Sequence, residues 1–325
     1  MGGEGPLGGR GARPLHGAGR GPHALDELTA RLELHPRAAR NFLDTLVALR
    51  FLDREGVHYR NTPVASIFLD RGKPETDVTG LLEIAGTWWY DSWRNLTKAL
   101  RTGEPQIDVT AGESNSFEAL YADPQRMEKF QRAMHGASLG ATLALVDEFP
   151  WSKYRTVADI GSASGTMLRG LLGRHAHLRG VGFDLPPLAP AFHRAAARAG
   201  LSDRLTFSAG DFFTDPLPSA DVLSFGHILH DWDLTTKRML LAKAFDALPP
   251  GGAVIVYDAM IDPGRSENVF GLLLSLHVMM ENPKAFAYTG AECLGWLADA
   301  GFCDGCVAHL SGPESMAIGF KPSTA

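Results

Sequence analysis

The sequence has few of the features that mark secreted, membrane-spanning or nucleic-acid-binding proteins. Its 325 residues include only three cysteines, too few for a disulfide framework. It has no apolar run of about 18 residues that would suggest a membrane span, and its glycine- and arginine-rich start lacks the apolar segment of a secretory signal. The net charge of −6 provides no basic field for nucleic acid or an anionic membrane. We therefore expect a cytoplasmic protein that binds neither a membrane nor nucleic acid.

Composition and patterning divide the chain into three parts. Residues 1–22 are rich in glycine and have no hydrophobic period, so we expect a disordered leader. Residues 23–150 show the apolar spacing of helices and predict a mainly helical domain. Residues 151–325 alternate short apolar runs with helical segments, which predicts an α/β domain. With 45% hydrophobic and 21% charged residues, the chain can form a core in each domain.

The helical domain opens with two helical patterns and a predicted hairpin within residues 23–60. This order is typical of a winged helix, which serves either DNA binding or packing between subunits. The segment holds equal numbers of arginine and acidic residues, and a neutral module neutralises phosphates poorly. We therefore expect a dimerisation module, with a winged-helix transcription factor as the alternative.

Large apolar side chains gather later in the helical domain. Trp88, Phe130 and Met134 belong to helical segments between residues 75 and 150. They form either an interdomain core or the wall of a pocket for a flat substrate. Together with Met280 in the second domain, they are our candidates for substrate contacts.

The second domain has the pattern of a parallel, doubly wound sheet. We predict its first five strands at residues 155–160, 180–184, 204–208, 220–226 and 252–258, with helices between them. A helix at 290–300 and two strands near 304–310 and 314–320 follow, which predicts a terminal antiparallel hairpin. This combination favours the Rossmann-like fold of class I S-adenosylmethionine (SAM) methyltransferases.

A small-residue loop follows the first of these strands, in the segment from Asp159 to Gly165. Such a strand-loop-helix turn brings backbone N–H groups close to a polar ligand. A dinucleotide site requires G-x-G-x-x-G, whereas glycines at Gly161 and Gly165 fit the D-x-G-x-G-x-G loop of SAM enzymes with its middle glycine replaced by alanine. We predict that Asp159, Gly161 and Gly165 bind the cofactor, the alternative being an ordinary glycine-rich turn.

The next two strand ends carry further candidates for cofactor binding, because open α/β sheets bind ligands at that edge. Asp184, which ends the second strand, is placed to accept hydrogen bonds from both ribose hydroxyls, or else caps the next helix. After the third strand, Gly210 and Asp211 precede Phe212; the carboxylate can accept from the adenine amino group and the ring can cover the purine, unless it is core.

The fourth strand end carries His230, which can act as a general base on an acceptor hydroxyl. Metal binding by His227, His230, Asp231 and Asp233 is one alternative, and a structural histidine is another. Asp233 is most simply the N-cap of a helix at 234–247. Cys303 and Cys306 have C-x-x-C spacing but no second pair of ligands. We expect no metal.

The segments His230-Asp231-Trp232, Gly210-Asp211-Phe212 and Asp184-Leu-Pro resemble small-molecule O-methyltransferases that include caffeate-type and acetylserotonin enzymes. The resemblance covers residues 23–320 or so. It implies a homodimer whose N-terminal domain helps to close the partner's active site. It also implies that His230 is the catalytic base, that Asp258 is one of two carboxylates bracing it, and that Asn282 lies near the acceptor.

The sequence departs from that family at three places. The family often has G-x-E-R-T before the penultimate helix, and its Glu, the second carboxylate that braces the histidine, is Ala287 here; Glu281 is a possible substitute. A basic residue four positions before the catalytic histidine is replaced by Gly226. The family's opening helices, which interlock the dimer, are replaced by the glycine-rich leader, which implies a weakened dimer or an atypical start.

The combined prediction is methyl transfer from SAM to a phenol or enol of a small aromatic molecule, leaving S-adenosylhomocysteine. The transfer is an in-line displacement that depends on positioning and exclusion of water. Methylation of nitrogen or sulfur on a heteroaromatic is one alternative, since a stronger nucleophile needs less help from a base. A SAM-binding accessory protein without turnover is another.

Overall fold

The computed structural model describes residues 21–106 and 116–323, which belong to two compact units. Unit 1 contains the described residues up to Asp91 together with Glu128–Ala137, and unit 2 contains Ser92–Met127 with Ser138–Ala325. The domain boundary that we expected at residue 150 does not coincide with this division. The leader expected at 1–22 lies, up to residue 20, outside the described residues.

Unit 1 contains the expected two helices and hairpin. The helix α3 begins at Pro36, whose fixed φ suits a first helical position, and the His35 ring caps it by accepting from the N–H of Arg37. A three-stranded antiparallel sheet has the order β1-β3-β2. Both elements bury one apolar side around Leu28, Leu43 and Tyr59. The bounds of unit 1 elements are β1 (His23–Ala24), α2 (Leu25–Arg31), α3 (Pro36–Ala48), β2 (Leu52–Glu55), β3 (His58–Asn61), α4 (Pro63–Phe68), α5 (Thr79–Ile84) and a π-helical turn at Ala85–Trp89.

The remaining helices and strands begin with α6 (Tyr90–Trp93), and α9 contributes its middle residues to unit 1. Before the sheet come α7 (Leu96–Thr102), α8 (Ser116–Ala122) and α9 (Pro124–Glu148). The sheet and its helices are β4 (Thr156–Ile160), α10 (Thr166–Arg174), β5 (Arg179–Asp184), α11 (Ala189–Arg198), β6 (Leu205–Ala209), β7 (Val222–Gly226), α12 (Leu234–Ala247), β8 (Ala253–Asp258), α13 (Val269–Glu281), α14 (Gly290–Asp299), β9 (Cys303–His309) and β10 (Ser315–Phe320). Each predicted strand and helix of the α/β domain is present.

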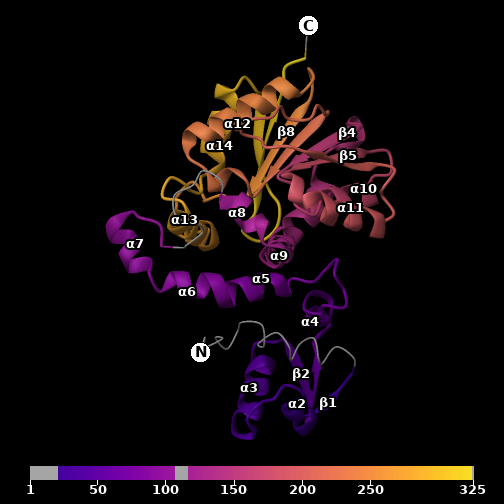
Figure 1. Cartoon of the computed structure of the whole chain (residues 1–325), viewed down its shortest axis with the longest axis vertical. Coiled ribbons are helices and arrows are strands. Elements are labelled where there is room, and N and C mark those ends of the chain that lie inside the picture. Colours follow the sequence, from indigo (N-terminus) through magenta and orange to yellow (C-terminus); the bar gives the residue numbers. More distant parts are fainter. Residues whose placement is uncertain (1–20, 107–115, 324–325) are drawn as a thin grey trace. The chain divides into compact units, whose positions relative to one another are not determined.

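The sheet of unit 2 has seven strands in the order β6-β5-β4-β7-β8-β10-β9. The first five pair in parallel, whereas β10 is antiparallel to both β8 and β9, as the predicted terminal hairpin requires. Chain order reverses between β4 and β7, which is where open α/β sheets bind ligands. Helices α10 and α11 cover one face and α12 and α14 the other (Figure 1).

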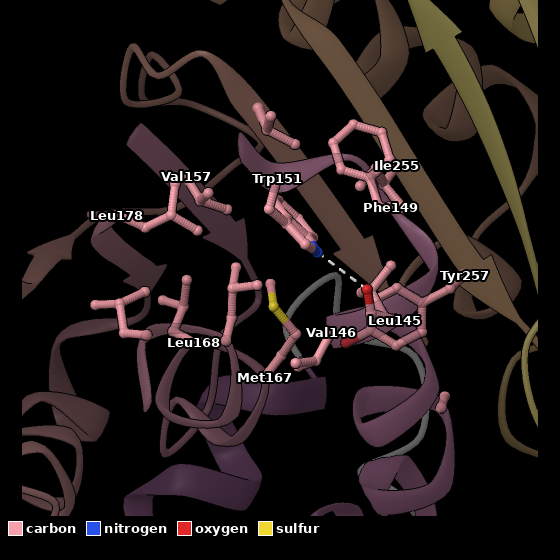
Figure 2. Packing of buried hydrophobic residues seen from close by; sticks show 14 of the residues in the cluster. Leu145, Val146, Phe149, Trp151, Val157, Met167, Leu168, Leu178, Ile255 and Tyr257 are labelled. Carbon is pink, nitrogen blue, oxygen red and sulfur yellow. Dashed lines mark hydrogen bonds between the residues drawn. The ribbon is translucent and has the colours of Figure 1, made fainter. Parts of the chain in front are cut away.

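Alternating side chains on the strands explain this layering. Val157 on β4 and Ile255 on β8 belong to the core under α10 and α11, whereas Ala158 and Val256 belong to the core under α12 and α14. Figure 2 shows the first of these cores, where the Trp151 indole lies among aliphatic side chains and its Nε1 donates to the Leu145 carbonyl at 3.0 Å. Burying both faces gives the strand ends a rigid support.

None of the helices in the described residues combines the length and the apolar character needed to cross a bilayer.

Candidate active site

The loop after β4 brings backbone close to a ligand position. Gly161 and Gly165 have φ values of +76° and +73°, a left-handed conformation that glycine adopts without strain. Ala163, which replaces the middle glycine of the motif, has φ +47°, at a cost of about 1–2 kcal/mol for a residue with a Cβ. A Cβ on Gly161 would lie 2.3 Å from the Ile228 side chain. The loop is therefore a close-packed turn that leads into α10.

Asp184 ties this loop to the end of β5. Its Oδ2 accepts from the Ala163 N–H at 2.8 Å, and its Oδ1 accepts from the Leu185 N–H at 2.7 Å. The helix α11 has no side-chain cap, so Asp184 does not serve the capping role that was its alternative. Burial raises the pKa of Asp184 to about 6, although both backbone bonds oppose the rise. Each carboxylate oxygen keeps acceptor capacity for a ligand hydroxyl.

The segment after β6 lies beside Asp184. The Gly210 N–H donates to the Asp184 carbonyl at 3.0 Å, and a Cβ on Gly210 would lie 2.6 Å from the Phe183 ring. The Asp211 carboxylate accepts from the Phe213 N–H at 2.9 Å. The Phe212 ring centroid lies 5.8 Å from that of Trp232, which follows β7. The three predicted strand ends thus meet at one edge.

Asp159 has a different environment from the loop that follows it. Its Oδ1 accepts from the Ser224 hydroxyl at 2.7 Å, because the two residues are register partners on β4 and β7. Burial raises the pKa of Asp159 to about 7. This carboxylate bonds between two strands, and its predicted contact with the cofactor stays a prediction.

These observations fit an adenosyl cofactor. Gly161 and Gly165 adopt left-handed conformations, and a Cβ on them would meet the Ile228 and Phe192 side chains. The Ser162 hydroxyl between them is buried with no hydrogen-bond partner. Asp184 keeps acceptor capacity suited to a ribose hydroxyl, and the Phe212 and Trp232 rings are of the kind that can cover a purine; their contacts with the cofactor stay predictions.

His230 and Asp258 form a buried pair at the same edge of the sheet. His230 lies in a short turn, Leu229–Asp231, after β7, and Asp258 ends the neighbouring strand β8. The His230 Nδ1 lies 2.7 and 2.9 Å from the two Asp258 oxygens, and its Nε2 lies 3.2 Å from Asp231 Oδ1. The Tyr288 hydroxyl donates to Asp258 Oδ2 at 3.1 Å. Asp258 therefore holds the His230 ring through hydrogen bonds, and the catalytic roles that the resemblance implies for the two residues stay predictions.

The two carboxylates decide the charge of His230. Burial alone would lower the pKa of this imidazole, but Asp258 and Asp231 outweigh burial and raise the pKa well above 6.5. Burial would likewise raise the pKa of Asp258, and the His230 charge and hydrogen bond hold it below its usual range. At neutral pH the favoured state is an imidazolium between carboxylates.

Glu281, the possible substitute for the missing carboxylate, has another partner: its Oε1 lies 3.2 Å from His277 Nε2, one helical turn away on α13. Residues that the sequence analysis missed lie near the pair instead. They are Tyr288, in the variant motif itself, and Glu314, which precedes the β10 residue paired with Asp258. A signal for Glu314 existed, since it is the acidic residue directly before the last strand.

His227 and Glu314 extend the polar cluster. The His227 Nδ1 lies 3.8 Å from Asp258 Oδ1 and 4.0 Å from Glu314 Oε2. Burial lowers the pKa of His227 to about 4 and raises that of Glu314 to about 8, so both are neutral at pH 7. Potential ligand atoms of His227, His230 and Asp258 lie within 4.8 Å of one another, close enough to hold a metal. The hydrogen bond between His230 and Asp258 already occupies two of them, and the absence of a metal stays a prediction.

The turn after β7 has further structural reasons for its sequence. Asp233 caps α12 by accepting from the Thr236 N–H at 2.8 Å, as predicted. A Cβ on Gly226 would lie 2.0 Å from the Tyr257 ring, so Tyr257 fills the space where the family often has a basic residue. Asn282 Nδ2 donates to the Asp231 carbonyl at 3.1 Å, which links the end of α13 to the turn.

The candidate substrate residues are divided between the units. Met280, which is fully buried, and Asn282 belong to unit 2 with the polar pair. Trp88, Phe130 and Met134 belong to unit 1, where the Lys129 ammonium lies 5.2 Å from the Trp88 ring centroid. Their predicted contacts with the acceptor stay predictions.

The seven-stranded sheet, the left-handed glycine loop and the strand-end carboxylates define a SAM-dependent methyltransferase of class I. Residues 93–303 match the family model described as an O-methyltransferase domain. The chain belongs to this O-methyltransferase family and transfers a methyl group from SAM to a hydroxyl group.

The relatives include proteins named for methylation of oxygen and of nitrogen. The chain is 44% identical over 302 residues to the tetracenomycin polyketide synthesis 8-O-methyl transferase of Streptomyces glaucescens, covering 93% of this chain and 88% of that protein. It is 40% identical over 246 residues to an N,N-dimethyltransferase of Streptomyces rimosus, covering 76% and 71%. The crystal structure of human N-acetylserotonin methyltransferase with SAM superposes with a TM-score of 0.85 at 23% identity, covering 97% and 91%, and shows the shared fold.

Proposed function

We propose that the enzyme methylates a phenolic hydroxyl of a flat aromatic compound of the polyketide type, and that His230 accepts the hydroxyl proton. The observation that carries this proposal is the buried pair of His230 and Asp258 at the sheet edge that also holds the glycine loop. The relative named for tetracenomycin polyketide synthesis supports the substrate class.

When bound, SAM would supply an electrophilic methyl group for the acceptor oxygen, the C–O bond forming as the C–S bond breaks and S-adenosylhomocysteine leaves. The protein holds the acceptor in line, excludes water and takes up the phenolic proton. Asp258 fixes the Nδ1 proton of His230, so Nε2 is the nitrogen that accepts. Asp231 Oδ1, 3.2 Å from Nε2, stabilises the ring once it is charged.

The pKa values decide how much help the base can give. A phenol near 10 and an unperturbed imidazole near 6.5 differ by roughly 3.5 units, or about 4.8 kcal/mol. The carboxylates narrow this gap because they raise the pKa of His230. The same rise in pKa reduces the fraction of His230 that is neutral at pH 7, and only the neutral ring can accept a proton. Base catalysis is therefore most effective where the pH approaches the pKa of His230. Turnover is therefore expected to rise with pH above 6.5.

The cofactor contacts are assigned on the same basis. We propose that Asp184 binds the ribose hydroxyls and that the loop from Gly161 to Gly165 binds the methionine part through backbone groups. Asp211 is assigned to the adenine amino group and Phe212 to the purine face. Trp88, Phe130, Met134, Met280 and Asn282 are the proposed acceptor contacts.

We also propose that unit 1 is a winged-helix dimerisation module. Its described residues include exposed apolar side chains on α4 and beside the hairpin, with Val64 at 64% and Leu49 at 59% exposure. Such surface favours a protein partner, and the chemistry fits a second copy of the chain. A Val64→Glu variant should sediment as a monomer where the parent sediments as a dimer.

The three unpaired cysteines suit a cytoplasmic location.

The experiment is a product scan. The protein is incubated with methyl-labelled SAM and hydroxyanthraquinones or hydroxynaphthoates, each with its amino counterpart. We expect label on oxygen. Transfer only to the amines would support the alternative of N-methylation, with which the similarity to an N,N-dimethyltransferase agrees. SAM binding without transfer to any acceptor would support an accessory protein.

A further inference from the structure

The helix α12 contains a lysine with no contact to solvent. Lys237 is 0% exposed, and burial lowers the pKa of its ammonium to about 8, so the group is charged at neutral pH. Burying a charge is costly unless hydrogen bonds compensate it. An apolar residue would suit this position better, because Leu240, Leu241 and Ala244 occupy the same buried side of the helix. The lysine therefore calls for a reason beyond packing.

The contacts of Lys237 point to the turn that carries His230. Its Nζ donates to the Trp232 carbonyl at 2.6 Å and to the Phe286 carbonyl at 3.0 Å. The same ammonium lies 3.3 Å from the Phe286 ring centroid, with the rings of Tyr288 and Trp296 at 5.6 and 5.8 Å. The aromatic rings around the ammonium thus stabilise its charge, and its two hydrogen bonds connect it to the carbonyl groups of two other segments.

These bonds close a ring of contacts around the catalytic turn. The Phe286 N–H donates to the His230 carbonyl at 3.1 Å, so Phe286 contacts the turn through its N–H and, via Lys237, through its carbonyl. Two residues later in that segment, the Tyr288 hydroxyl reaches Asp258. The segment before α14 thus touches both partners of the pair, and Lys237 fixes its position.

We propose that Lys237 is a positioning residue: it joins the turn of His230 to the Phe286–Tyr288 segment and so holds the imidazole in line with Asp258. This inference rests on the proposed function of His230 as base. In this chain the segment has Ala287 in place of the glutamate of the family motif. The ammonium of Lys237, on α12, holds the segment against the turn of His230 instead.

The charge of Lys237 adds a second effect. Its ammonium faces carboxylates from four places: Asp258 on β8, Asp231 in the turn, Asp233 at the start of α12 and Glu292 on α14. The His230 imidazole faces Asp258 and Asp231, with His227 and Glu314 further out. Because the ammonium offsets these negative charges, its removal should make His230 harder to deprotonate.

The test compares Lys237→Met with Lys321→Met. Lys321 makes matching contacts at the other end of α12, since its Nζ donates to the Phe245 and Leu248 carbonyls at 2.6 and 2.8 Å and lies 4.6 Å from the Phe245 ring centroid. We expect Lys237→Met to lower turnover about 10- to 100-fold with the Kd for SAM changed less than threefold, and to move the rising limb of the pH–rate profile to higher pH. Lys321→Met should change neither.

Three results would overturn the proposal. They are parent-like turnover and pH profile in Lys237→Met, an equal loss in Lys321→Met, and unfolding of both Lys237→Met and the milder Lys237→Gln at assay temperature, which would make Lys237 a stability residue. A His230→Ala variant assayed alongside separates the two ideas. If His230→Ala keeps its turnover, the proposed function fails; if it loses turnover while Lys237→Met does not, only this inference fails.

Discussion

Replacing Asp258 by asparagine should shift the rising limb of the pH–rate profile to lower pH and lower the rate at its plateau. Asp258 holds His230 Nδ1 at 2.7 and 2.9 Å, and a hydrogen bond to a charged group contributes about 1.5–3 kcal/mol. Losing that contribution should lower the pKa of His230 by roughly 1–2 units. The neutral imidazole then forms at lower pH, so the rising limb should move to lower pH by a similar amount.

The plateau should fall at the same time. A weaker base takes a proton from the phenol less readily, and a neutral amide no longer fixes the ring and its Nδ1 proton. We expect a plateau about 10²–10⁴-fold below that of the parent, the range for loss of general base catalysis. The Kd for SAM should stay within about threefold, since Asp258 is not among the proposed cofactor contacts.

The assay measures turnover with labelled SAM between about pH 5.5 and 10, a range that covers the expected change in the pKa of His230. Asp299→Asn is the control. Asp299 is an exposed carboxylate paired with Arg238 at 3.1 Å, so its loss should leave the profile unchanged. A limb that stays in place, or moves to higher pH, would refute the bracing of His230 by Asp258.

Four further predictions concern cofactor binding and metal dependence. Asp184→Ala should weaken SAM binding roughly 10- to 150-fold, the equivalent of about 1.5–3 kcal/mol in charged hydrogen bonds, measured by calorimetry. In the parent the Kd for SAM should rise as the pH falls through about 6, because the Asp184 carboxylate, whose pKa is raised to about 6, becomes protonated there. A Kd that stays constant between about pH 5 and 8, the range of that titration, would contradict the ribose assignment. Gly161→Ala should also weaken SAM binding, because the φ of +76° strains a Cβ that would lie 2.3 Å from Ile228, whereas Gly173→Ala, in open space, should not. Prolonged dialysis against EDTA should leave turnover unchanged, and activity restored only by an added divalent ion would show that the cluster of His227, His230 and Asp258 is a metal site.

Local patterns predicted the α/β part of the chain closely. A helix follows the glycine loop as predicted, at Thr166–Arg174, and the helix after Asp233 has the predicted bounds, Leu234–Ala247. Apolar period, caps and glycines act within a few residues, so the sequence displays them directly. The strand ends follow from the same patterns, and parallel pairing brings Asp184 and Gly210 together at one edge.

Contacts between distant segments were less accessible. Glu281 was a reasonable candidate by its place near Ala287, but the helical spacing to His277 gives it another partner. Tyr288 reaches Asp258 through a loop path that no local pattern encodes. Glu314 is recognisable as the acidic residue before the last strand, but only the pairing of β10 with β8 brings it close to Asp258. Lys237 was detectable, because it lies three and four residues before Leu240 and Leu241 on the buried side of α12. Its two hydrogen-bond acceptors, however, are the carbonyls of Trp232 and Phe286. These residues are 54 positions apart in the sequence, and only the fold brings them together.

The most direct measurement is single-turnover methyl transfer by His230→Ala, with a phenolic acceptor from the product scan and labelled SAM bound beforehand. We expect the rate to fall about 10²–10⁴-fold while calorimetry gives a Kd for SAM within twofold of the parent (about 0.4 kcal/mol). A rate within about threefold of the parent, with cofactor binding equally intact, would show that another group removes the proton and would contradict the role assigned to His230.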